Sequence, residues 1–357
     1  MRLGLNLGYA GAADAEGSVV LALEAERLGY DIVWAAEAYG SDAATVLAWI
    51  GSATTRIKLG SAVFQIPART AAMTAMTAAT LDNLSGGRFS LGLGLSGPQV
   101  SEGWHGVRYD APLQRTREYV DVVRMMLGGE RVRYQGAHIT LPLPDGPGKA
   151  LSLALRPGHH LHSLPGGRGI PIYLAAMGPK NLALAGELEA NLLPLFFAAE
   201  HADYWLAPYL DARERVTAER GGCDIAPTFP LVIADDIAAA ADVVRPNAAL
   251  YVGGMGSREK NFYAELAGRY GYETQARVVQ DLFLSGDKAG AEAAVPFEFI
   301  DKTSLIGAVD RVADRLQALR DVGVTTVSVT LFGATVHERI EQLRSCAAAF
   351  DKAGVGQ

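Results

Sequence analysis

The feature that most constrains the fold of this sequence is a regular alternation of short apolar runs with helix-like segments. Each run is short enough to form a single strand, and helix-like periodicity follows most of the runs. Strands that alternate with helices in this way pair in parallel. Eight runs fit the pattern: residues 3–7, 31–36, 57–64, 89–95, 171–176, 192–197, 229–234 and 325–331.

Eight such units without a mid-chain linker predict an α/β fold closed into a (β/α)8 TIM barrel, with an open doubly wound sheet as the alternative. We expect a single domain over residues 1–357, because one large barrel accommodates a chain of this length. Residues 128–170 are rich in glycine and proline and predict a loop-rich insertion after the fourth strand. Residues 248–303 predict a second insertion with helix-like segments, after the seventh strand.

Helical periodicity marks the segments between the strands. We expect helices at residues 19–28, 70–84, 113–127 and 337–350, and one that begins near Pro179. A further helix before the eighth strand is indicated by a one-sided row of Leu305, Val309, Val312, Leu316 and Leu319.

The charge and composition exclude several classes of partner. With 32 basic and 39 acidic residues the net charge is −7, and no lysine- and arginine-rich block stands out, so we expect no nucleic-acid partner. No apolar stretch of about 18 residues predicts a membrane span, and the first residues lack the apolar segment of a signal peptide. Two distant cysteines fit a reducing compartment, so we expect a cytoplasmic protein.

Active sites of barrels lie at the carboxyl ends of the strands, so the residues directly after each run are the candidates. Few of these residues are strong acids, bases or nucleophiles. The sequence also lacks Gly-x-Ser-x-Gly, the phosphate-loop lysine motif and the double histidine of metalloproteases. A site with so few reactive side chains favours a cofactor that carries the chemistry itself.

One candidate phosphate site is the segment 175–181, which has the pattern of a strand end, a glycine turn and a helix start. Backbone N–H groups at a helix start, with Lys180 beside them, are suited to hold a phosphate. The alternative is an ordinary turn with a solvated Lys180. Gly92 and Gly94, near the end of the fourth run, indicate close approach of either a flat ligand or a neighbouring backbone.

Two further side chains are candidates for catalysis. Glu37 follows the second run, and a carboxylate at the barrel mouth is costly to bury unless it is paired or functional. The alternative is a salt-bridged structural glutamate. His105, next to Trp104, is equally open to a catalytic or a structural interpretation. For the histidine-rich loop we predict no metal site, because no carboxylate or cysteine lies near His159, His160 and His162.

Taken together, several segments in order resemble the luciferase-like monooxygenase superfamily, and within it the actinobacterial deazaflavin-dependent oxidoreductases. The resemblance runs from residue 3 to about residue 331. Its densest stretches are residues 33–42, 65–70, 78–82, 85–89, 96–100, 102–106, 172–176, 178–181, 251–256 and 261–263.

This resemblance implies an oxidoreductase that holds coenzyme F420, or FMN in some relatives, across the barrel mouth. It implies a non-prolyl cis peptide behind the cofactor ring, here at Ala62–Val63, and a phosphate near Ala176, Gly178 and Lys180. The cofactor-binding residues that it implies are Ser61, Ala62, Val63, Ser96, Gly97, Ala175, Ala176, Gly178, Pro179 and Lys180. For the carboxylates of the F420 tail, Arg69, Arg156 and Arg168 are candidates, with solvated surface roles as the alternative.

The implied reaction is hydride transfer between the deazaflavin C5 and a small organic substrate, with a proton supplied when a C=C, C=N or C=O bond is reduced. Candidate proton donors are Glu37, Tyr39 and His105, and candidate substrate contacts are Trp104 and Gln65. The alternatives are an FMN-dependent monooxygenase and a barrel that binds cofactor or substrate without turnover. The habit of the superfamily, with the alanine- and methionine-rich residues 71–79, predicts a homodimer or higher homo-oligomer.

Three positions depart from the pattern of the superfamily. Its sugar-phosphate dehydrogenases carry Asp-His where this chain has Glu37-Ala38, and a catalytic glutamate where it has Pro98, so oxidation of sugar phosphates by that mechanism is not expected. Before the sixth strand, residues 189–192 (Glu-Ala-Asn-Leu) replace Ala-Asp-Gly-Trp. This replacement predicts altered cofactor geometry at that segment.

Overall fold

A ring of parallel strands forms the centre of the protein in the computed structural model, which describes residues 1–9, 15–145, 147, 151–155, 169–216 and 222–356. The ring strands are β1 (Arg2–Asn6), β2 (Ile32–Ala35), β3 (Lys58–Ser61), β5 (Phe89–Gly94), β8 (Ile172–Leu174), β9 (Asn191–Leu192), β10 (Thr228–Ile233) and β12 (Thr326–Leu331). Two short strands, β4 (Phe64–Gln65) and β11 (Leu305–Gly307), pair with β5 and β10. Every residue of β2 and β5 is buried, as expected for strands covered on both faces.

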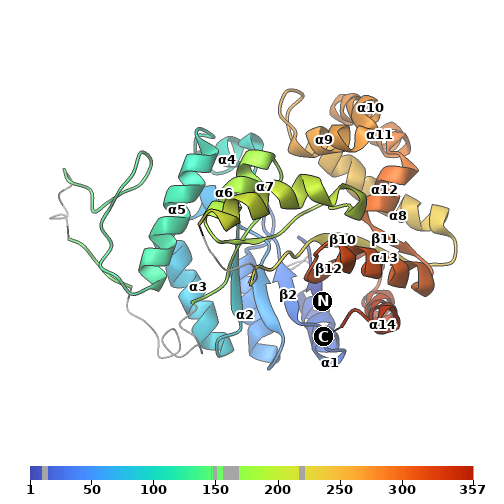
Figure 1. The fold of residues 1–357 in the computed structure, drawn as a ribbon, viewed down its shortest axis with the longest axis horizontal. Helices are drawn as coiled ribbons and strands as arrows, with labels where there is room; N and C mark the ends of the chain where they lie inside the picture. Colours follow the sequence, from blue (N-terminus) through green and yellow to red (C-terminus); the bar gives the residue numbers. More distant parts are fainter. Residues whose placement is uncertain (10–14, 146, 148–150, 156–168, 217–221, 357) are drawn as a thin grey trace.

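The sheet closes on itself. β1 pairs with β2 on one side and with β12 on the other, and the order continues from β2 through β3, β5 and β8 to β9. Two isolated parallel bridges, Leu192 with Ile225 and Leu195 with Thr228, join this end to the start of β10, whose other neighbour is β12. The predicted barrel is therefore confirmed, and the open doubly wound sheet is excluded (Figure 1).

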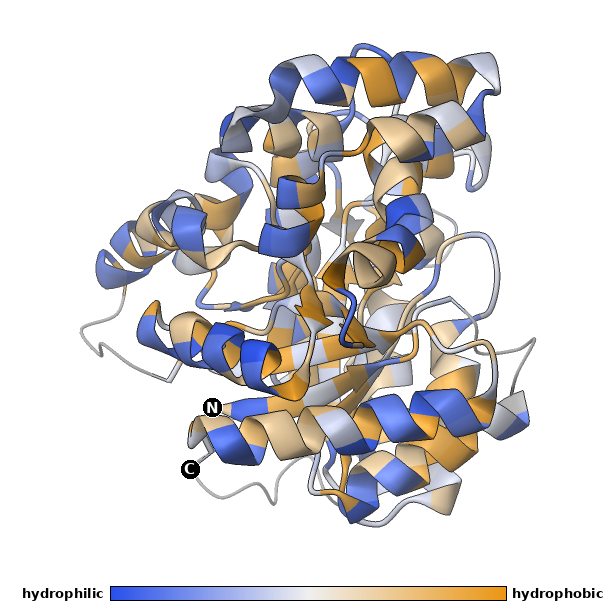
Figure 2. Cartoon of the chain, turned by 90° about the vertical axis from the view of Figure 1, so that its right-hand side faces the viewer, coloured by the Kyte–Doolittle hydropathy of each residue, from blue (hydrophilic) through white to orange (hydrophobic). Residues whose placement is uncertain are grey.

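Helices cover the outside of this ring. They are α1 (Ala15–Arg27), α2 (Ala43–Ala53), α3 (Ala71–Ser85), α5 (Pro112–Leu127), α6 (Pro179–Glu187), α7 (Ala202–Glu214), α13 (Val309–Asp321) and α14 (Val336–Ala353). Capping side chains set three of the starts, because Asp42 accepts from the N–H of Thr45, Thr70 from that of Met73, and Thr335 from that of Glu338. Figure 2 shows hydrophobic strands at the centre and helices of mixed hydropathy around them, as expected for helices with one buried face.

Further elements lie between β5 and β8 and between β10 and β11, before and within the two segments predicted as insertions. Between β5 and β8 the structure has α4 (Pro98–Gly103), α5 and a hairpin of β6 (Tyr134–Gln135) and β7 (Thr140–Leu141). Between β10 and β11 it has α8 (Ile237–Ala249), the π-helical turn η3 (Leu250–Gly254), α9 (Phe262–Ala267), the turn η4 (Gly268–Tyr272), α10 (Glu273–Ser285), α11 (Lys288–Ala294) and α12 (Phe297–Thr303). Short 3-10 turns are η1 (Ile66–Ala68) and η2 (Ala199–His201). In Figure 1, helices α9 to α12 gather beside the barrel on the same side as α4.

Two details of the predicted pattern are wrong. Leu305 does not share a helix with Val309, because it begins β11 and the helix starts four residues later. Apolar residues four apart fit a helix face, so spacing alone did not separate the two elements. The sixth strand is also shorter than residues 192–197, because β9 ends at Leu192 and Phe196 has a left-handed backbone (φ 59°).

A single carboxylate ties strands together at the amino ends of the barrel. Asp224 accepts hydrogen bonds from the hydroxyls of Tyr173 (2.7 Å) and Thr326 (2.8 Å), and one from Thr325. It also pairs with Arg2 at 2.8 Å. These partners belong to β8, to β1 and to the start of β12. Asp224 therefore connects three strands at the floor of the barrel, which is the end opposite the mouth.

Two charged side chains organise the turns that enter β3 and β5. The Arg88 guanidinium donates to the carbonyl oxygens of Gly51, Thr54 and Ile57 at 2.6–3.1 Å, and burial lowers the pKa of Arg88. Glu26, in α1, accepts the backbone N–H groups of residues 55–57. Burial acts to raise the pKa of Glu26, but these hydrogen bonds outweigh it and lower the pKa to about 2.

Within the described ranges, no helix combines the length and apolar character needed to cross a membrane. The same ranges contain no group of three or more histidine, cysteine, aspartate or glutamate residues that suits a metal ion. His159, His160 and His162 lie outside the described residues.

Candidate active site

The end of β3 makes an irregular turn at the barrel mouth. The peptide bond Ala62–Val63 is cis, as predicted. Ser61 Oγ donates to the carbonyl oxygen of Gly92 (2.8 Å) and accepts from its N–H (2.9 Å). A side chain at Gly92 would collide with the Ser61 backbone, and one at Gly94 with Val63. The two glycines of β5 therefore leave room for the end of β3, and the buried Ser61 hydroxyl fixes that end to β5.

A small apolar surface lies above the barrel interior. Ala62, Val63 and Ala175 are partly buried and pack on a cluster of fully enclosed side chains: Ile32, Trp34, Tyr173, Leu193 and Ala226. Trp34 and Tyr173 meet edge to face with ring centroids 5.1 Å apart, which makes the layer beneath rigid. Small side chains on a rigid layer suit one face of a flat ring.

The start of α6 keeps free backbone donors. Gly178 is the N-cap with an extended backbone and no capping side chain, and Pro179 is the first helical residue. The N–H groups of Asn181 and Leu182 both donate to the Gly178 carbonyl oxygen at 2.9 Å. Among the hydrogen bonds between described residues, the N–H groups of Gly178 and the exposed Lys180 have no acceptor. This arrangement suits an anion, and the buried Ala176 lies two residues before Gly178.

Glu37 is enclosed and ion-paired. Its Oε1 contacts the Arg69 guanidinium and accepts the N–H of Gln65 at 3.1 Å, and its Oε2 accepts the N–H of Ala43 at 3.2 Å. The side chains of Glu37 and Arg69 are only 7 % and 13 % exposed. The structure therefore satisfies the Glu37 carboxylate fully, as the salt-bridged alternative requires.

Gln65 connects Glu37 to His105. Its Nε2 donates to the backbone oxygen of Glu37 (3.2 Å), which turns its Oε1 toward His105 Nε2 at 2.7 Å. Because an amide oxygen only accepts, His105 Nε2 must be the donor, and the neutral ring carries its proton there. Three residues chosen from the sequence thus form one hydrogen-bonded chain.

The remaining predicted residues are spread over the mouth. Tyr39 is 58 % exposed, and Trp104, at the end of α4, is 64 % exposed. Ser96 has a left-handed backbone (φ 58°). A side chain on Gly97 would lie 4.0 Å from the Met255 carbonyl oxygen, so the loop after β5 approaches the segment after η3.

Two predicted elements fall elsewhere. In the segment 189–192, Asn191 Oδ1 accepts the N–H of Asp224 at 2.8 Å, next to the barrel floor. This segment begins β9, where Leu192 pairs with Leu174 of β8, and its effect on cofactor geometry stays a prediction. Arg156 and Arg168 lie outside the described residues.

One contact at the mouth was missed. The hydroxyls of Tyr9, after β1, and Tyr251, in η3, lie 3.1 Å apart. Tyr9 has the position expected of a mouth residue, but the two tyrosines are separated by 242 positions. No local pattern links residues so far apart along the chain.

The sequence comparisons identify the family of this chain. A profile of the family described as luciferase-like monooxygenase matches residues 3–326. A protein of Mycobacterium tuberculosis (strain ATCC 25618 / H37Rv), named "Putative coenzyme F420-dependent oxidoreductase", is 44 % identical over 98 % of both chains. A 5,10-methylenetetrahydromethanopterin reductase of Archaeoglobus fulgidus is 29 % identical over 85 % of this chain and 86 % of its own.

The structure comparison supports the fold. The coenzyme F420-dependent tetrahydromethanopterin reductase of Methanopyrus kandleri superposes with a TM-score of 0.78 at 24 % identity, over 96 % of this chain and 97 % of that one. The profile match spans most of the ring, from β1 to the first residue of β12, and the 44 % identity extends along nearly the whole chain. This chain belongs to the luciferase-like monooxygenase family.

Proposed function

We propose that this protein is an F420-dependent oxidoreductase that transfers a hydride between the deazaflavin C5 and a small organic substrate with a C=C, C=N or C=O bond. The observation that carries the proposal is the pairing of a small apolar surface (Ala62, Val63 and Ala175) with free N–H donors at the start of α6. The name of the relative at 44 % identity supports the choice of cofactor.

The residues at the mouth fit such a cofactor. Ala62 and Val63 would face the flat ring, and Ala175 would extend the same surface. The N–H groups of Gly178 and Lys180, with the Lys180 ammonium, would hold the phosphate. When bound, F420 supplies a carbon that takes up or releases a hydride.

His105 is the proton donor in this proposal. Its Nε2–H is engaged by Gln65 Oε1, which leaves Nδ1 to take up a proton and release it to the substrate. Glu37 and Arg69 are positioning residues, because they fix Gln65 from the other side. Trp104 and the loop after β5 would orient the substrate and exclude water.

The exposed face of α2 and α3 supports a homodimer. Trp49 of α2 is 63 % exposed, and Met73, Met76 and Leu84 of α3 are 52 %, 51 % and 73 % exposed. The neighbouring alanines of α3 are buried against the chain itself. Large apolar side chains exposed on two neighbouring helices favour burial against a second copy.

Spectrophotometric titration of the purified protein with F420 and with FMN tests the cofactor. The proposal expects tighter binding of F420 and a pH-dependent turnover that His105→Asn reduces while F420 affinity is kept. Tighter binding of FMN, with oxygen consumption, would replace the proposal by an FMN-dependent monooxygenase. Binding of neither cofactor would favour a barrel without turnover.

A further inference from the structure

A pair of tyrosine hydroxyls at the mouth has no part in the site proposed above. Tyr9 follows β1 and keeps 43 % of its surface exposed, whereas Tyr251, in η3, keeps 9 %. Their hydroxyl oxygens are 3.1 Å apart, within hydrogen-bond distance. The pair therefore joins the open mouth to the enclosed helical segment.

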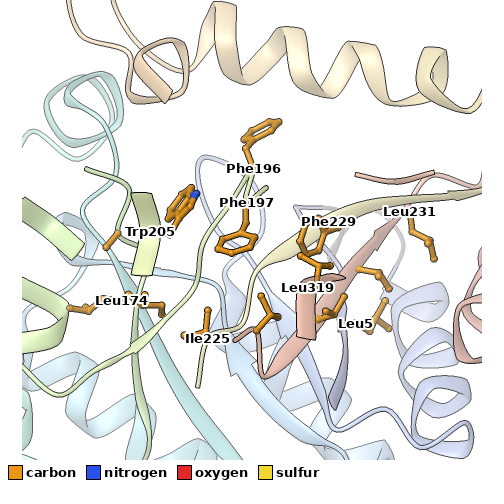
Figure 3. Packing of buried hydrophobic residues seen from close by; sticks show 14 of the residues in the cluster. Leu5, Leu174, Phe196, Phe197, Trp205, Ile225, Phe229, Leu231 and Leu319 are labelled. Atoms are coloured by element: carbon orange, nitrogen blue, oxygen red, sulfur yellow. The ribbon is translucent and has the colours of Figure 1, made fainter. Parts of the chain in front are cut away.

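Tyr251 is held rigidly. Its ring meets Tyr263 at 4.8 Å and Phe196 at 5.4 Å, both edge to face. Asn261 Nδ2 donates to the carbonyl oxygens of Tyr251 (3.2 Å) and Val252 (2.8 Å), which fixes the backbone of η3. Figure 3 shows Phe196 directed away from its neighbour Phe197, which points into the core. The position of the Tyr251 hydroxyl is thus set before any ligand arrives.

Both phenols stay protonated at neutral pH. Partial burial raises the pKa of Tyr9, against an opposing hydrogen bond from Tyr251, and nearby Tyr39 raises it further. Burial also raises the pKa of Tyr251 well above its usual value, with Tyr9 and Tyr263 adding to the effect. The pair consequently offers O–H donors set among aromatic rings.

The geometry favours one direction for the hydrogen bond between the two hydroxyls. Tyr251 is enclosed, so its O–H is best satisfied by the Tyr9 oxygen, and the Tyr9 O–H then has no acceptor among the described residues and can donate to a ligand. A donor that itself accepts a hydrogen bond is strengthened by it. Tyr39 lies close enough to Tyr9 to raise its pKa, and the exposed rings of the two tyrosines supply faces for stacking.

We infer that Tyr9 and Tyr251 form a substrate subsite that binds an aromatic compound through a neutral acceptor atom, such as a ketone oxygen. Tyr9 donates to that atom, and Tyr251 is a positioning residue behind it. A carboxylate would be desolvated against aromatic rings, which is unfavourable without a cation. This inference rests on the proposed function, because it names the substrate class of the same barrel mouth.

Three naphthalenes of similar shape test the subsite on the full-length protein with oxidised F420, which prevents turnover. 2-Acetylnaphthalene carries the neutral acceptor, 2-ethylnaphthalene lacks it, and 2-naphthoate replaces it by an anion. In calorimetry we expect the ketone to bind about three- to tenfold more tightly than the hydrocarbon, the worth of one hydrogen bond. Tighter binding of the naphthoate, or equal binding of ketone and hydrocarbon, overturns the inference.

Tyrosine-to-phenylalanine variants test whether the preference for the ketone comes from the two hydroxyls. Tyr9→Phe removes one oxygen and should bring the ketone-to-hydrocarbon ratio to about one, whereas Tyr251→Phe should reduce it in part. Tyr134→Phe is the matched control, because that hydroxyl bonds Asp121 in a different part of the chain. An unchanged ratio in Tyr9→Phe refutes the role of Tyr9.

A separate F420 titration distinguishes this inference from the proposed function. F420 affinity should be the same in the wild type and in Tyr9→Phe, since Tyr9 is not placed at the cofactor surface. A wild type that binds F420 but shows no preference for the ketone would overturn the subsite alone. Ketone preference without F420 binding would overturn the cofactor assignment and support the subsite.

Discussion

Replacement of Arg69 by methionine tests whether Glu37 is a buried, paired carboxylate. The change removes the guanidinium but keeps a long apolar side chain over the Phe64 ring, where the Arg69 Cζ now lies 4.4 Å from the ring centroid. Glu37 keeps its two backbone N–H donors and loses its charged partner.

The expected loss of stability follows from the burial of the two side chains. Removing one member of a buried ion pair costs about 3–5 kcal/mol, because the other charge remains without compensation. The two remaining N–H donors offset part of this cost, so we expect the lower end, about 3 kcal/mol. The second partner of Arg69, Asp42, is 47 % exposed and contributes less than about 1 kcal/mol.

Urea unfolding followed by tryptophan fluorescence measures the effect. Glu37→Gln combined with Arg69→Met removes the unpaired charge of the Glu37 carboxylate, so the double variant should be more stable than Arg69→Met alone. Arg117→Met is the matched control, because its pair with Glu187 is 38 % and 39 % exposed and should be worth less than about 1 kcal/mol.

Two results would refute this reasoning. If Arg69→Met and Arg117→Met lowered the free energy of unfolding equally, water would be screening the Glu37 pair. If the double variant were less stable than Arg69→Met, the stability lost in Arg69→Met would not come from an unpaired charge on Glu37.

Four further outcomes are expected. Arg88→Met should lower the free energy of unfolding by about 3 kcal/mol, since several carbonyls lose one charged donor together; a loss below about 1 kcal/mol would contradict this. Because the pKa of Glu26 is lowered from 4.5 to about 2, its stabilising effect is complete above pH 4.5 and is lost as the pH falls toward 2. The difference in Tm between wild type and Glu26→Gln should therefore shrink between pH 6 and pH 3, and a constant difference would argue against it. Lys180→Glu should weaken F420 binding about three- to tenfold in an absorbance titration, and an unchanged affinity would remove Lys180 from the site. Trp49→Glu should convert a dimer to a monomer in light scattering, whereas a monomeric wild type would exclude the dimer.

The ring of strands was predictable because most strands are short runs dominated by apolar and small residues, as expected for buried strands of a parallel sheet. The helix α2 went unpredicted, although its Asp42 cap is visible in the sequence, because small residues weaken its apolar pattern. β11 was missed because it has three residues and Leu305 also fits the periodicity of the next helix.

The candidate site was predictable residue by residue but not as a network. Position after a strand identified Glu37 and His105, and the resemblance identified Ala62–Val63. The ion-pair partner of Glu37 could not be predicted, because nothing in the sequence relates Arg69 to one carboxylate rather than another. For the same reason Tyr251 was not recognised as the partner of Tyr9, because that contact exists only once the insertion has folded over the mouth.

The pairing of β1 with β12 places a condition on biosynthesis. Arg2 lies opposite Thr326, so almost the whole chain must leave the ribosome before the first strand meets its second neighbour. Until then the nascent sheet has two unpaired edges, which are able to pair with strands of other chains. Contacts between such distant residues also form slowly. Yield in a cell therefore depends on how long this open-edged intermediate persists, and a variant that slows ring closure would aggregate without any loss of stability in the finished barrel.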